Sequence, residues 1–262
     1  MRRLYYLINH EYRLLYPALL SVPAGLLIMT QMLVLRQTWR YSREDNPLWY
    51  RLDQIIDQSG VPVLFMFAVI ILLLFCAASL RQQLLQPRSL FTYYQISPGA
   101  AAVFTAKALM VMSGLVLLVL TQLVAVIIAW RLFWVPAVPP GQVPASLLLG
   151  IVRSPFLSIL YPGHFRLAIP LLLSLALLGT ATPALVLDLH RSARIGRSQR
   201  WSWFLSALLL AGLLLTLTRI HSVLSESISL TAYIARLIPQ AVLLAIICWR
   251  SIRALKNRTL DL

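Results

Sequence analysis

Residues 61–80, VPVLFMFAVIILLLFCAASL, form an apolar run without a charged side chain. A helix of this length rises about 1.5 Å per residue and spans the hydrocarbon core of a membrane, which is about 30 Å thick. Comparable runs occupy 17–35, 108–130, 167–187, 201–218 and 231–249. The alternating segments of a membrane β-barrel do not occur. The pattern predicts an all-α integral membrane protein whose six transmembrane helices make residues 1–262 a single transmembrane domain.

Composition supports this class. The chain is 60% hydrophobic and 12% charged, and a soluble domain carries about twice that charged fraction. Its net charge of +15 lies mainly in the segments between apolar runs, where the positive-inside rule expects basic residues. We therefore expect a membrane partner and no nucleic acid. The two cysteines, Cys76 and Cys248, lie in apolar runs far from any cluster of ligands, which indicates buried thiols rather than a metal site.

Residues 1–16 and 145–161 are the ambiguous apolar segments. In 1–16, apolar side chains at positions 4, 5, 8, 12 and 15 share a helical face, which predicts an amphipathic helix at the membrane interface. The alternative is a plain extension of the first span into water. The segment 145–161 is interrupted by Arg153 and Pro155. It reads as an interfacial or re-entrant piece rather than a seventh span.

The distribution of charge predicts the orientation. With six spans and the N-terminus in the cytoplasm, the inner segments carry fourteen basic and three acidic residues, and the outer segments, counted together with Arg236, carry nine and five. Both termini are then cytoplasmic, as the positive-inside rule favours. A seventh span at 145–161 would place the arginine-rich stretch 188–200 outside. The polar segment 36–60, with Trp39 and Trp49, suits the outer interface.

Motifs for chemistry are missing from the sequence. No GxxxxGK[ST] phosphate-binding loop, HExxH zinc motif or GxSxG nucleophile motif occurs. The four histidines are far apart in the chain. We therefore predict no catalytic, cofactor-binding or metal-binding residue, and no enzymatic activity of the chain itself.

A few polar residues lie within the spans. Three pairs occur in helices one, three and four, and interhelical hydrogen bonds are a commoner role for such residues than substrate binding: Thr30 and Gln31, Thr121 and Gln122, Thr180 and Thr182. The one charge inside a span, Arg236, either pairs with Glu226 or extends toward the outer surface.

The inner segment 81–107 contains the most informative motif. Pro87 and Pro98-Gly99 bracket a stretch that can form two helical turns, 89–96. It ends in Gln95-Ile96-Ser97-Pro98-Gly99, and Lys107 follows ten residues after Ser97. Aromatic side chains within it suit either an interface with a partner or the lipid headgroup belt.

This layout resembles the ABC-2 type permease family, the membrane subunits of one class of ABC exporters. The resemblance covers nearly the whole chain and rests on the N-terminal amphipathic helix, the six spans, the basic inner loop and the turn at 95–99. It implies a type V exporter-like transmembrane domain in the cytoplasmic membrane of a bacterium. It also implies a dimer with a second copy or a paralogue, surrounded by lipid.

In that family the short inner helix is the coupling helix, which docks into a groove on a separate ATPase. By this resemblance the docking residues are Arg88, Ser89, Leu90, Phe91, Tyr93, Tyr94 and Ile96. ATP and magnesium would bind to the ATPase partner and not to this chain. The acidic residue and glycine that often precede the coupling helix are absent from 81–86.

The uncharged spans favour an amphipathic exported substrate, such as a peptide, an antibiotic or a lipid. Two other classes remain open at this point: a membrane-embedded enzyme, which would need converging acids or histidines, and a membrane adaptor or sensor that does not transport.

Overall fold

A computed structural model describes residues 2–43, 52–85, 100–137, 146–163, 165–195, 237–238, 240–249 and 252–253. Every regular element in these ranges is helical, as the sequence predicts. Four of the helices are long and apolar enough to cross a membrane, over Leu15–Arg40, Val61–Gln82, Ala102–Trp134 and Ala168–Leu187. The described part of the chain therefore has the helices of a multi-pass α-helical membrane protein.

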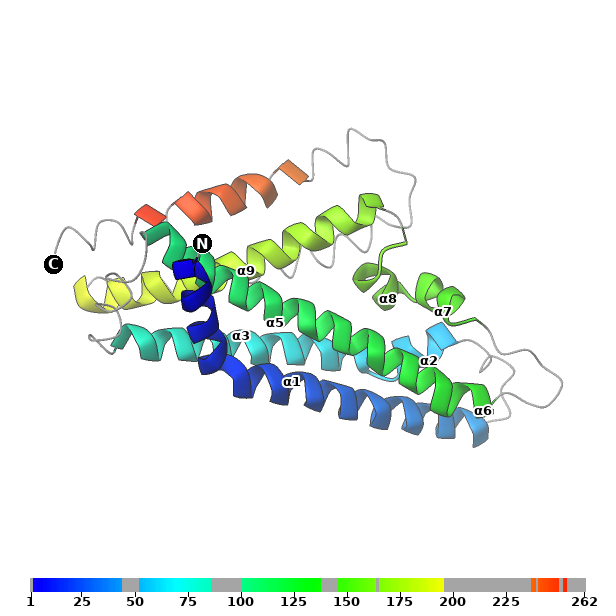
Figure 1. Cartoon of the computed structure of the whole chain (residues 1–262). Helices are drawn as coiled ribbons and strands as arrows, with labels where there is room; N and C mark the ends of the chain where they lie inside the picture. The colour runs from blue at the N-terminus through cyan, green and yellow to red at the C-terminus, as the bar shows by residue number, and fades with distance from the viewer. Residues whose placement is uncertain are drawn as a thin grey trace. The chain divides into compact units, whose positions relative to one another are not determined.

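The long helices are α1 (Arg2–Arg43), α3 (Val61–Leu85), α5 (Ala100–Ala129) and α9 (Phe165–Ile195) (Figure 1). Each of them extends past the apolar run that predicted it. In α5 the helix starts eight residues before the expected position 108, because nothing between the Pro98-Gly99 breaker and Ala108 interrupts it. The predicted inner loop 81–107 is shorter as a result.

Helix α1 is continuous through Tyr16 and Pro17, where the sequence suggested that an interfacial helix ends. Its residues 2–16 are helical, and their position on the membrane surface stays a prediction. The predicted fifth span, 201–218, lies outside the described residues. Of the sixth, 231–249, the structure describes an apolar helix over Gln240–Trp249.

Short elements lie between the long helices. A two-residue turn with Gly60 at φ +83° joins α2 (Leu52–Gln58) to α3, and only glycine adopts this left-handed conformation at little cost. After α5 the helix widens into a π-helical turn, Trp130–Trp134, in which the Val135 N–H bonds to the Trp130 carbonyl, and α6 (Val135–Ala137) follows. Helices α7 (Leu147–Arg153) and α8 (Pro155–Leu160) precede α9.

The chain divides into two compact units, which the long helices α1, α3, α5 and α9 share. The first unit comprises Met1–Pro17, Leu73–Leu115 and Leu172–Leu262. Within it Gly179 of α9 lies against α5, and a Cβ at this position would stand 3.2 Å from the Ala108 carbonyl oxygen. A small residue thus permits a close approach of two helices, as is common within membranes.

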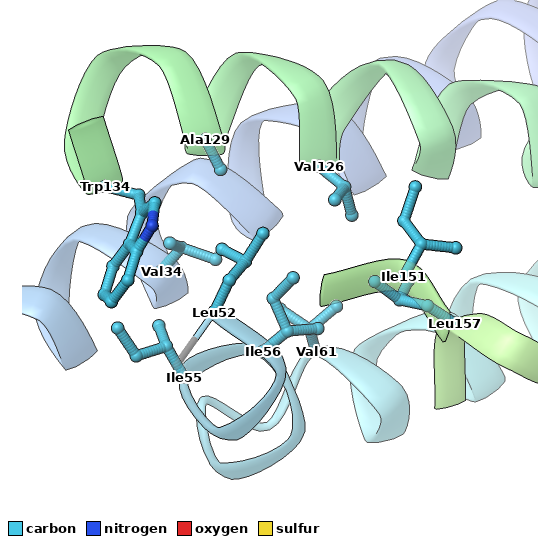
Figure 2. Packing of buried hydrophobic residues seen from close by; sticks show 10 residues of the cluster. All are labelled: Val34, Leu52, Ile55, Ile56, Val61, Val126, Ala129, Trp134, Ile151 and Leu157. Atoms are coloured by element: carbon cyan, nitrogen blue, oxygen red, sulfur yellow. The ribbon is translucent and has the colours of Figure 1, made fainter. Parts of the chain in front are cut away.

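The second unit comprises Ala18–Leu72 and Val116–Leu171. Its core gathers apolar side chains from α1, α2, α3, α5, the π-helical turn, α7 and α8 (Figure 2). Trp134, Leu52 and Ile56 are almost completely buried there. The short helices α2, α7 and α8 therefore pack against the ends of the long ones rather than standing apart.

The outer faces of the long helices are apolar. Along α3, one stripe at helical spacing is buried and the opposite stripe is exposed, with Phe67, Leu74 and Phe75 more than half exposed. In water such a face would be costly, whereas hydrocarbon chains solvate it without penalty. The pattern suits a helix that turns one face to its neighbours and the other to lipid.

Candidate functional site

The residues of the expected coupling helix, Arg88 to Ile96, lie outside the described part of the chain. The structure places its two flanks: α3 ends at Leu85 and α5 begins at Ala100. Lys107 is in the second turn of α5 and is 8% exposed. The sequence placed it in the inner loop at the mouth of the span, and the structure places it within the helix.

The polar pairs of α1 and α5 meet across the interface of the two helices. The Thr30 hydroxyl donates to Gln122 Oε1 at 3.5 Å, and Gln31 Nε2 donates to the Ala125 carbonyl at 2.8 Å. Thr30 and Gln122 are completely buried. The prediction of interhelical hydrogen bonds is confirmed for Thr30, Gln31 and Gln122.

The other three polar residues bond within their own helices. Thr121 donates to the Leu117 carbonyl, Thr180 to that of Ala176 and Thr182 to that of Leu178, all between 2.8 and 2.9 Å. Within the described residues, the structure shows no interhelical hydrogen bond for these three. The reason is that a hydroxyl on a helix reaches the carbonyl four residues earlier, which satisfies it without a neighbour.

Helices α7 and α8 form a bent pair, which the sequence predicted as a re-entrant or interfacial piece. They have seven and six residues, and Ser154 between them is extended at ψ 119°. Neither helix is long enough to cross a membrane. The exposed face of α7 is apolar, with Leu148 75% and Val152 64% exposed, which suits contact with lipid at the interface.

Ser154 links this pair to α2. Its side chain is completely buried, accepts a hydrogen bond from the Leu157 amide at the start of α8, and donates to Asp57 Oδ1 of α2 at 2.7 Å. Beside it, Gly150 of α7 leaves room for Leu52, whose Cδ2 would lie 2.8 Å from a Cβ at position 150. No local sequence pattern signals the contact of Ser154 with Asp57, because the two residues are 97 positions apart in the chain.

Tyr161 attaches the end of α8 to α5. Its hydroxyl donates to the Val119 carbonyl at 2.6 Å. Burial raises the pKa of the Tyr161 phenol above its usual value, because a charged phenolate is poorly solvated there. The phenol therefore stays protonated and keeps its role as a donor.

In these described ranges, no three side chains of His, Cys, Asp or Glu come together as a metal site would require. Several of the polar contacts in the described residues join one helix to another, as Thr30 does with Gln122 and Ser154 with Asp57. No protein-family model matches the sequence, and no curated protein or solved structure is significantly similar to it.

Proposed function

We propose that this chain is the membrane subunit of an ABC exporter of the ABC-2 type, energised by a separate ATPase. The observation that carries the proposal is the segment 86–99. It joins two long apolar helices, α3 and α5, and its sequence contains Phe91, Tyr93 and Tyr94 between Pro87 and Pro98. Aromatic anchors in a short connection favour docking into a groove on a protein partner.

Several further features support the proposal. Four apolar helices of membrane-spanning length fit a transport subunit, and the absence of a phosphate-binding loop in the sequence assigns hydrolysis to a partner. Lys107 near the start of α5 is where the family resemblance expects a lysine at the entry of the third span. On this proposal the chain has six spans, cytoplasmic termini and a second permease subunit beside it. The exported substrate is amphipathic, because the predicted spans are almost free of charged side chains.

The test is co-purification with an ABC-type ATPase encoded beside this chain. The double variant Phe91→Ala with Tyr94→Ala removes two anchors, each worth on the order of 2 kcal/mol, and should lower recovery of the ATPase at least tenfold. The matched control is Trp39→Ala, since Trp39 is an exposed aromatic residue near the C-terminal end of α1. It should leave recovery unchanged.

A double variant that retains its ATPase at the normal yield, with the membrane fold intact, would contradict the docking role. In that case the rings rest among lipid headgroups. Failure of any adjacent ATPase to bind the unaltered chain would count against the exporter itself.

A further inference from the structure

The interface between α1 and α5 contains polar groups without partners. Gln31 Oε1 and Gln122 Nε2 are both buried and make no hydrogen bond in the structure. They belong to neighbouring positions, since Thr30 reaches Gln122 and Gln31 reaches Ala125, which is three residues further along α5. One acceptor and one donor are thus left over in a single interface within the membrane-spanning part of the helices.

Exchanging the oxygen and nitrogen of either amide does not remove the deficit. The Gln31 amide uses one end on the Ala125 carbonyl, and the Gln122 amide uses one end on Thr30. Whichever way each amide is turned, the atom at its other end is left without a hydrogen-bond partner. Neither orphan atom bonds to the other, so a third group has to supply the missing bonds.

We propose that a water molecule occupies this position and bridges Gln122 Nε2 to Gln31 Oε1. Water both donates and accepts, which is what the two groups need. Buried waters usually have two to four polar partners, and Thr30 Oγ1, which is free to accept, offers a third. The Thr30–Gln122 contact of 3.5 Å is at the long limit of a hydrogen bond, as expected where two helices are held slightly apart.

A larger guest does not suit the site. Thr30 and Gln122 are completely buried, and apolar side chains such as Val34 and Val126 pack along the same interface. The proposal concerns the contact of α1 with α5 and does not depend on the transport function.

Thermal unfolding of near-isosteric variants in the full-length protein tests the proposal by the sign of the change. Gln122→Met and Gln31→Met each remove one end of the bridge and leave the other buried group unpaired. Each should lower the Tm by about 2–6 °C. The double variant removes both groups and should recover much of this loss. The control is Thr121→Val, whose hydroxyl bonds within its own helix.

A high-resolution density map of the protein, held by an antibody fragment, provides the direct readout. The expected result is a peak within hydrogen-bond distance of both amides, absent from the Gln122→Met map. An empty gap, a direct bond between the two amides, or a higher Tm for either single variant would overturn the proposal. A rise in Tm would mean that the orphan groups have no partner at all.

Discussion

At the scale of single residues, Ser154 is a buried polar side chain outside the candidate spans that makes two hydrogen bonds. Replacement by alanine removes the cap of α8, worth about 1 kcal/mol, and the bond to Asp57. A hydrogen bond to a charged group contributes about 1.5–3 kcal/mol. We therefore expect Ser154→Ala to lower the free energy of unfolding by about 2–4 kcal/mol, measured by denaturant titration in detergent.

Ser146 provides the matched control, because it also caps a short helix but is exposed and bonds only to the Leu149 amide. Ser146→Ala should cost about 1 kcal/mol or less. Equal losses for the two variants would show that the link between Ser154 and Asp57 contributes nothing to stability.

At the scale of elements, the sequence predicts the four described spans, and it does not predict the short helix α2. A run such as 61–80 needs no tertiary information, since its length and lack of charge are enough. From sequence alone, α2 falls within the polar segment 36–60, because Asp53 and Asp57 obscure the helical spacing of Leu52, Ile55 and Ile56. All three of these apolar residues are buried, and their spacing was the available signal.

In the candidate site, too, the sequence indicates some of the polar residues but not their contacts. The sequence singled out Thr30, Gln31 and Gln122 because a polar side chain in an apolar run is conspicuous. It could not tell them from Thr121, because the difference lies in what faces each residue across the interface. Contacts such as Ser154 with Asp57 join segments that are distant in the chain, and no local pattern encodes them.

The packing of α7 on α2 gives a prediction for a pair of elements. A methyl group at position 150 would overlap Leu52 Cδ2, so Gly150→Ala should destabilise the protein by about 1–3 kcal/mol. Leu52→Ala leaves a cavity and should cost about 2–5 kcal/mol. Combined, the two changes should cost less than their sum, because the new methyl group partly fills the space that Leu52 leaves.

Thermal unfolding of the four proteins in this cycle measures the coupling. Gly25→Ala is the control for the effect of alanine itself, since a Cβ there meets nothing within 4 Å. It should leave stability unchanged or raise it. Strict additivity of Gly150→Ala and Leu52→Ala would contradict the contact between α2 and α7.

At the scale of the whole molecule, the bent pair α7–α8 leads to a prediction about the side of the membrane on which the remaining chain lies. It stands between two candidate spans, Ala102–Trp134 and Ala168–Leu187. Because neither short helix is long enough to cross the membrane, we expect the chain to leave the first of these spans and to enter the second on the same side. We then expect the arginine-rich stretch 188–200 to lie on the opposite side, which the positive-inside rule predicts to be the cytoplasm.

Single cysteines test this topology with a membrane-impermeant maleimide. The background carries Cys76→Ala and Cys248→Ala, which remove the two native thiols. Leu148→Cys, at an exposed position of α7, and Gly163→Cys, at an exposed position between α8 and α9, should both be labelled in intact cells. Ile195→Cys, at the end of α9, should be labelled only in inverted vesicles.

If positions 148 and 163 reacted from opposite sides, the segment between them would have to cross the membrane, and a count of seven spans would replace six. If position 195 reacted in intact cells while 148 and 163 did not, the spans would stand but the orientation would be reversed, and the segment 86–99 would face away from any cytoplasmic ATPase.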